Sequence, residues 1–137
     1  MQRCNGGETF EMSTPLGRRP EYALLPKPKV RALRLAHPER LPVVVHVHHV
    51  VPDLPDFKFL VPLISPMWNV LHATRNQLRR KDVPHAETKA LVLFVQGRYL
   101  VPQSAMLRDL AASHCDEDGA MHVVLREESV FGGTTGA

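Results

Sequence analysis

The sequence predicts an α+β fold in which four strands form one mixed sheet around a single main helix. Two strand-like segments, 41–51 and 57–61, precede a helical apolar pattern over 67–78. Two further strand-like segments, 90–95 and 121–125, come after it. Because the helix joins the two halves as a crossover, we expect the first and last strands to be neighbours at the centre of the sheet.

The first two strands are predicted as a hairpin. The segment 41–51 is rich in β-branched valine, with Pro42 near its start and Pro52 directly after it. The segment 57–61 alternates large apolar residues with Lys58 and Leu60, which gives a strand two distinct faces. The connecting sequence Pro-Asp-Leu-Pro-Asp suits a turn between them.

The main helix is predicted to begin with Ser65 as the N-cap and Pro66 as the first helical position. Trp68 is expected to pack in the core. Apolar or buried-type residues then recur at helical spacing on one face: Met67, Val70, Leu71, Thr74 and Leu78.

The second half of the chain supplies two strands and a short helix. The nearly continuous apolar run 90–95 predicts a central strand buried on both faces. Ser104 is expected to open a helix with Met106, Leu107 and Leu110 facing inward. An acidic turn at 116–119 then leads into the last strand. The full order is typical of a ubiquitin-like β-grasp roll.

The amino-terminal region is predicted as a flexible, proline-rich extension over residues 1–28. One helical turn at 21–25 is the most that its prolines allow. The segment 29–36 places Val30, Leu33 and Leu35 among basic residues, so we expect a short amphipathic helix with its arginines outward. The ubiquitin-like domain is therefore assigned to 29–132, and 133–137 to a tail.

Composition limits the class of protein. A chain of 137 residues fits one domain, and no apolar run approaches the roughly 20 residues that cross a bilayer. Because no apolar signal precedes the domain and Cys4 and Cys115 are the only cysteines, we expect a cytoplasmic, reduced monomer. The net charge of +3 favours acidic partners or anionic surfaces, but no basic block indicates nucleic acid.

Two groups of residues suggest a metal site or a catalytic site, but the spacing of their residues along the chain supports neither. His46 and His48 share a face of the first strand, but no cysteine or carboxylate stands at matching spacing, so zinc remains a minor alternative. The run 113–116 holds nucleophile, base and acid types in adjacent positions, which point about 100° apart on a helix. No metal, cofactor or catalytic residue is predicted.

The carboxyl terminus carries a Gly-Gly pair at 132–133 after an extended segment. Glycine has no Cβ, so such an end can enter a narrow enzyme channel and present an unhindered carboxylate. Together with segments 38–45, 57–62, 93–95, 116–119 and 128–132, it resembles the ubiquitin-like autophagy modifiers. That family includes microtubule-associated protein light chain 3 and GABA-receptor-associated protein.

The resemblance implies a processing and conjugation site. A cysteine protease is expected to cut between Gly132 and Gly133, after Phe131. Activating and conjugating enzymes would then join the Gly132 carboxylate to phosphatidylethanolamine on the autophagosomal membrane. An association of the extension with microtubules stays open.

The resemblance also implies a surface that binds aromatic-x-x-aliphatic peptides of cargo receptors by strand addition. Its first pocket would comprise Leu33, Pro42, Val44, Lys58 and Leu60, and its second pocket Phe59, Val61, Pro62, Val70 and Ala73, with Arg75 nearby. Three positions depart from the family's pattern: Ala120 stands where the family has an aromatic residue, Asp56 where it has a basic one, and Ser65 where it has an aliphatic one. Two alternatives remain: a protein-conjugated modifier of the sister branch, and a β-grasp interaction domain that is never conjugated.

Overall fold

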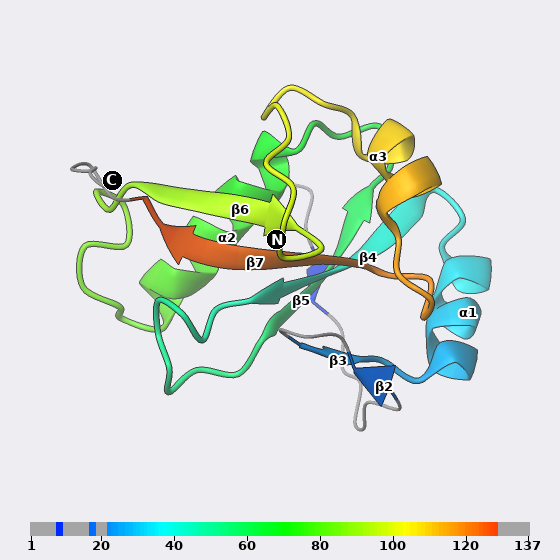
Figure 1. Ribbon diagram of the computed structural model, residues 1–137, viewed down its shortest axis with the longest axis horizontal. Helices are drawn as coiled ribbons and strands as arrows, with labels where there is room; N and C mark the ends of the chain where they lie inside the picture. Colours follow the sequence, from blue (N-terminus) through cyan, green and yellow to red (C-terminus); the bar gives the residue numbers. More distant parts are fainter. Residues whose placement is uncertain (1–7, 10–16, 19–21, 129–137) are drawn as a thin grey trace.

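One five-stranded sheet, in the order β1-β5-β4-β7-β6, forms the centre of this computed structural model, which describes residues 8–9, 17–18 and 22–128 (Figure 1). Its strands are β1 (Glu8–Thr9), β4 (Arg40–His46), β5 (Phe57–Pro62), β6 (Leu91–Val95) and β7 (Met121–Glu127). A separate two-stranded sheet pairs β2 (Gly17–Arg18) with β3 (Ala23–Leu24). The helices are α1 (Lys27–Ala36), α2 (Trp68–Arg80) and α3 (Leu107–His114).

The predicted fold class is confirmed. Strands β4 and β7 run parallel at the centre, and every other neighbouring pair in the main sheet is antiparallel. The first and last predicted strands are therefore central neighbours, because the chain crosses from one to the other through α2. The two-residue strand β1 was not predicted; it extends the four predicted strands at the outer edge of β5.

The two faces of the sheet are covered differently. On one face, α2 packs Val70, Ala73 and Leu78 against inward residues of β4, β5, β6 and β7. On the other face, Val30 of α1 packs against Val44, while Tyr22 and Leu24 pack against Val124. The exposed arginines of α1 confirm the predicted amphipathic helix, although the helix begins at Lys27 and not at residue 29.

Several strand expectations are corrected. The first strand ends at His46 because the N–H groups of Val50 and Val51 both bond the Val47 carbonyl and form a turn. The run 90–95 is an edge strand and not a central one. Strand β6 lies at the end of the sheet, with Val92 and Phe94 only half-buried. The strand is apolar throughout because one of its faces is buried and the other is half-buried.

The helix starts also differ from expectation. The helix α2 begins at Trp68 with Met67 at its N-cap and no side-chain cap bond, so the predicted cap at Ser65 was wrong; Ser65 is buried before the helix, and its carbonyl accepts the N–H of Leu107. Trp68 is 51% exposed, so the expected core position was wrong. The short helix begins at Leu107 and not at Ser104.

The helical turn predicted at 21–25 is not found among the described residues 22–25. Residues Ala23–Leu24 form β3, which pairs with β2. The flexibility assigned to 1–28 and the boundary of the tail stay predictions, since much of both lies outside the described residues. Within the described part, no helix is long and apolar enough to cross a membrane.

Candidate functional site

Strand β5 places most residues of the two implied pockets on opposite faces of the sheet, although Pro62 of the second pocket has the parity of Lys58 and Leu60. Its pairing with β4 sets Pro42 opposite Leu60 and Val44 opposite Lys58. These four side chains share the α1 face, because residues two apart on a strand point the same way. Phe59 and Val61 point to the α2 face and join the main core.

The structure brings the implied first-pocket residues together on the α1 side. Val44 is buried in a small cluster with Val30 and Ala120, and Leu33 packs against this cluster half-buried. Leu60 is buried and Lys58 is half-buried on the neighbouring strand. Ala120 is fully buried at the base of this cluster, so its small side chain is covered by α1.

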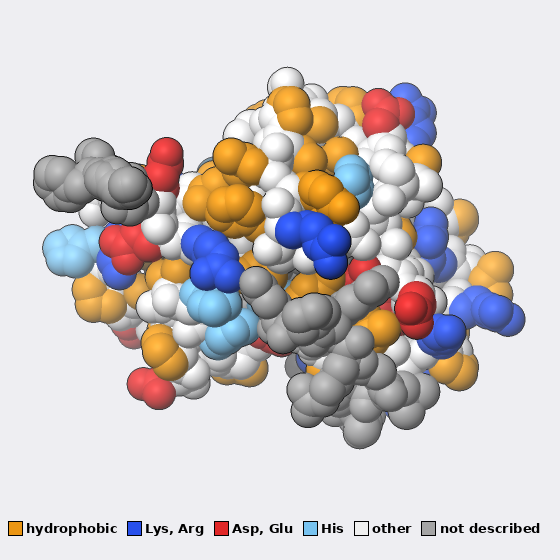
Figure 2. Space-filling model, in the orientation of Figure 1, with side chains coloured by type: hydrophobic (Ala, Val, Ile, Leu, Met, Phe, Trp, Pro, Cys, Tyr) orange, Lys and Arg blue, Asp and Glu red, His pale blue; other side chains and the backbone are white. Residues whose placement is uncertain are grey.

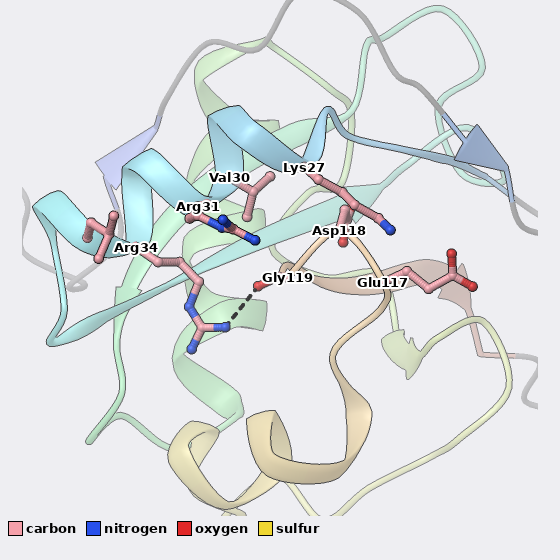
Figure 3. A pocket seen from close by; sticks show the side chains of 8 residues that line it. Lys27, Val30, Arg31, Arg34, Glu117, Asp118 and Gly119 are labelled. Carbon is pink, nitrogen blue, oxygen red and sulfur yellow. Dashed lines mark hydrogen bonds between the residues drawn. The ribbon is translucent and has the colours of Figure 1, made fainter.

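A hollow of about 290 Å³ lies on another side of α1, between that helix and the turn 116–119 (Figure 3). Lys27, Arg31 and Arg34 line it from the helix, and the Arg34 Nη1 donates to the Gly119 carbonyl at 3.3 Å. Figure 2 shows basic side chains along the margin where Figure 1 places α1. Leu33 and Leu60 are not among its lining residues, so it is not the implied peptide pocket.

The implied second-pocket residues lie together but are closely packed. Phe59, Val61, Val70 and Ala73 are each at most 3% exposed and belong to the main core. Pro62 is half-buried at the end of β5. An incoming side chain would therefore require β5 and α2 to move apart.

Arg75 is engaged by the loop that follows α2. Its Nη1 donates to the Ala86 carbonyl at 3.0 Å and to the Lys89 carbonyl at 2.9 Å. The guanidinium therefore holds this loop against the helix. A role beside a bound peptide would require Arg75 to give up these contacts.

On the sheet face that α1 and Tyr22 cover lies a polar row, buried except at Asp56, that the sequence analysis did not identify. The His46 Nδ1 contacts Asp56 Oδ2 at 2.8 Å, and the His46 Nε2 contacts the His122 Nδ1 at 2.9 Å. The His122 Nε2 contacts Asp118 Oδ2 at 2.7 Å. We call these four side chains the histidine row.

Tyr22 covers the histidine row. Its ring stacks on the rings of His46 and His122, with centroids 4.5 and 4.6 Å away, and its hydroxyl donates to Asp116 Oδ2 at 2.6 Å. The signal that could have found the row is a histidine in each of two otherwise apolar strands that the fold places side by side.

The structure gives the zinc alternative no support. His46 faces Asp56 and His122, whereas His48 is exposed and contacts the ring of His49. Among the described residues, no group of three or more histidine, cysteine or acidic side chains is arranged to hold a metal ion.

The pKa directions follow from burial and from the row's hydrogen bonds. Burial lowers the pKa of His46, although Asp56 acts in the opposite sense. Burial raises the pKa of Asp118, but hydrogen bonds from His122 and two backbone N–H groups outweigh it and leave the pKa below its ordinary value. The pKa of Asp56 is likewise lowered, because its bond to His46 outweighs burial.

The run 113–116 is not a catalytic group. Asp116 accepts hydrogen bonds from Tyr22 and Gln96, and burial raises the pKa of the Cys115 thiol. Helix α3 ends at His114, and Cys115 follows as its extended C-cap. These residues form a helix end that supports the histidine row.

Comparison with known proteins identifies the family. A family model described as "Autophagy protein Atg8 ubiquitin like" matches residues 27–132, which span the main helix, both hairpins and the central parallel pair. The chain belongs to the Atg8 family. It is therefore a ubiquitin-like autophagy modifier, a class of modifiers and adaptors and not of enzymes.

Individual relatives agree with this assignment. An autophagy-related protein 8-like protein of Dictyostelium discoideum is 33% identical over 82% of this chain and 90% of its own length. Autophagy-related protein 8b of Arabidopsis thaliana is 29% identical over 92% of this chain and 94% of its own. Human microtubule-associated protein 1 light chain 3 gamma is 29% identical over 76% of this chain and 69% of its own length.

Proposed function

We propose that this Atg8-family chain is cut between Gly132 and Gly133 and joined through Gly132 to phosphatidylethanolamine. One observation carries the proposal: the family match ends at Gly132, with five residues of the chain beyond it. Both Phe131 and Gly132 lie outside the described residues.

The described structure is compatible with enzyme access to that end. The central strand β7 ends at Glu127, and the Glu128 N–H donates to the Ala90 carbonyl at 2.7 Å. Gly132 follows four positions later. In Figure 1 strand β7 ends on the side of the domain away from α1.

The chemistry needs no catalytic group from this chain. A protease would hydrolyse the Gly132–Gly133 peptide bond and release residues 133–137. The new carboxylate would be adenylated, transferred as a thioester to a cysteine of each carrier enzyme, and attacked by the lipid amine to give an amide. Glycine suits each step because no Cβ crowds the reacting carbonyl.

The same proposal assigns the outer edge of β5 to recognition of cargo receptors. A peptide with an aromatic residue and, three positions later, an aliphatic one would add as a strand there and place those two side chains on opposite sides of β5. Lys58, Leu60 and Leu33 would meet the aromatic residue. Backbone pairing would give affinity, and the pockets would give selection. The chain would act in the cytoplasm and, after lipidation, on autophagosomes.

Intact mass of the protein recovered from starved cells tests the conjugation. We expect loss of residues 133–137 and a membrane-bound form whose added mass disappears on phospholipase treatment. The Gly132→Ala variant should remain full length, whereas Gly133→Ala, its matched neighbour, should still be cut and lipidated.

Other results would contradict the proposal in distinguishable ways. Recovery of the Gly132 carboxylate on a lysine of a partner protein would assign the chain to the protein-conjugated branch. An unprocessed full-length protein that keeps its cellular role in the Gly132→Ala form would leave a non-conjugated interaction domain.

A further inference from the structure

The edge of β5 that we assign to peptide docking already pairs with the chain's own amino-terminal segment. Strand β1 lies antiparallel to β5, with Glu8 opposite Leu60 and Thr9 opposite Phe59. It is the outermost strand on that side of the main sheet. A peptide added to β5 from outside would occupy the same position.

The backbone of Leu60 explains why β1 and a peptide would compete. In an antiparallel pair, opposed residues alternate between bonded and non-bonded pairs. The Leu63 N–H donates to the carbonyl of the opposed Glu39, so the alternation makes Pro42–Leu60 a non-bonded pair with β4. The N–H and carbonyl of Leu60 therefore point away from the β4 backbone, toward β1, and the carbonyl also accepts a hydrogen bond from the Arg40 Nη1 at 3.2 Å.

Described residues between β1 and α1 anchor this segment to the domain. Tyr22 is buried, stacks on the histidine row and bonds Asp116. The adjoining β2 and β3 pair Gly17 with Leu24 and Arg18 with Ala23. Thr9 thus lies thirteen positions from a buried anchor. A tether of that length keeps β1 near β5 at an effective concentration on the order of millimolar.

We propose that residues 8–9 act as an intramolecular strand that occupies the β5 edge and must be displaced before a partner peptide binds. This inference rests on the proposed docking function of β5 and adds its regulation. Only two residue pairs form, so the closed state is weak and a longer peptide strand can displace it. Release of β1 would increase affinity without any change in the pockets.

Adjacent proline substitutions test the proposal in the full chain. The Glu8 N–H faces Leu60, whereas the Thr9 N–H faces away, because successive residues of a strand direct their amides to opposite sides. Glu8→Pro should therefore break the pairing, while Thr9→Pro should be tolerated as proline is on a sheet edge. Glu8→Gln controls for the lost charge.

The first measurement is the binding of a synthetic aromatic-x-x-aliphatic peptide by calorimetry. We expect Glu8→Pro to bind about fivefold more tightly than the parent, and the two control variants to stay within about twofold. Equal binding by Glu8→Pro and the parent would overturn the inference and leave the docking function intact. No binding by any of the proteins would overturn the docking function itself.

The second measurement needs no peptide. Hydrogen exchange of the Leu60 amide should be slowed by β1 in the parent and in Thr9→Pro, and should be about fivefold faster in Glu8→Pro. Unchanged exchange at Leu60 in Glu8→Pro would show that residues 8–9 do not occupy the edge.

Discussion

The His46 Nε2 and the His122 Nδ1 lie 2.9 Å apart in the interior, on two parallel strands whose histidines are 76 positions apart in the chain. The remaining ring nitrogens contact Asp56 and Asp118. Three hydrogen bonds thus join four side chains, and each bond needs one proton.

Burial lowers the pKa of His46, which favours its neutral imidazole. In this form the His46 Nδ1–H donates to Asp56, and the His46 Nε2 faces the His122 Nδ1. The His122 Nε2–H donates to Asp118, which is ionised because its pKa is lowered.

Loss of His122 should destabilise the fold strongly. His122→Leu keeps much of the volume but leaves the Asp118 carboxylate buried without its hydrogen bond to His122, and we expect the free energy of unfolding to fall by about 3 kcal/mol. Urea unfolding followed by circular dichroism measures it. His48→Leu, at an exposed position of the following turn, should stay within about 0.5 kcal/mol of the parent. Equal effects of the two substitutions would contradict a structural role for the row.

Stability should decrease in acid in two stages. The folded pKa of His46 lies below its ordinary value of 6.5, so the unfolded chain binds more protons there and stability falls as pH drops through this window. Asp56 and Asp118 have pKa values below their ordinary value of 3.8, so a second loss follows as pH falls from about 3.8 through these lowered pKa values.

The groups that influence His46 electrostatically are Asp56, His122 and His48. Urea unfolding between about pH 7.5 and about pH 5 measures the first stage. His46→Gln should flatten the profile in this range, whereas His48→Gln should keep most of it. A parent protein whose stability does not change over this range would refute the assignment.

The hydroxyl of Tyr22 should contribute measurably to stability. Tyr22→Phe keeps the stacking on both histidines but removes the bond to buried Asp116, and we expect a loss of about 1.5 kcal/mol. Tyr99→Phe provides the matched control, because Tyr99 is 42% exposed. Thermal or urea unfolding distinguishes the two. A loss in Tyr99→Phe as large as in Tyr22→Phe would argue against this anchor.

The close approach of α1 to the turn at 119 depends on glycine. Gly119 has φ +89°, and a Cβ there would lie 3.3 Å from the Val30 Cγ1. Gly119→Ala should therefore cost about 2 kcal/mol through backbone strain and displacement of α1. Gly97→Ala, at φ +75°, controls for the backbone strain. If both variants unfold at the same urea concentration, the Val30 contact adds nothing.

Much of the fold could be predicted because local patterns carry it. Valine-rich and alternating segments specify β4 and β5, helical spacing specifies α2, and the order of elements specifies the crossover that makes β4 and β7 neighbours. The edge position of β6 could not be predicted in this way, because an apolar run of this length is expected both for a strand with one neighbour and for a strand with two.

The amino-acid sequence by itself determined the order of strands and helices, the amphipathic α1 and the glycine pair at 132–133, since each depends on residues close together in the chain. Only the tertiary structure decided that His46 meets His122, that Tyr22 covers both and that residues 8–9 pair with β5. These contacts join residues far apart in sequence. Strand register and packing set them, and no local pattern encodes either.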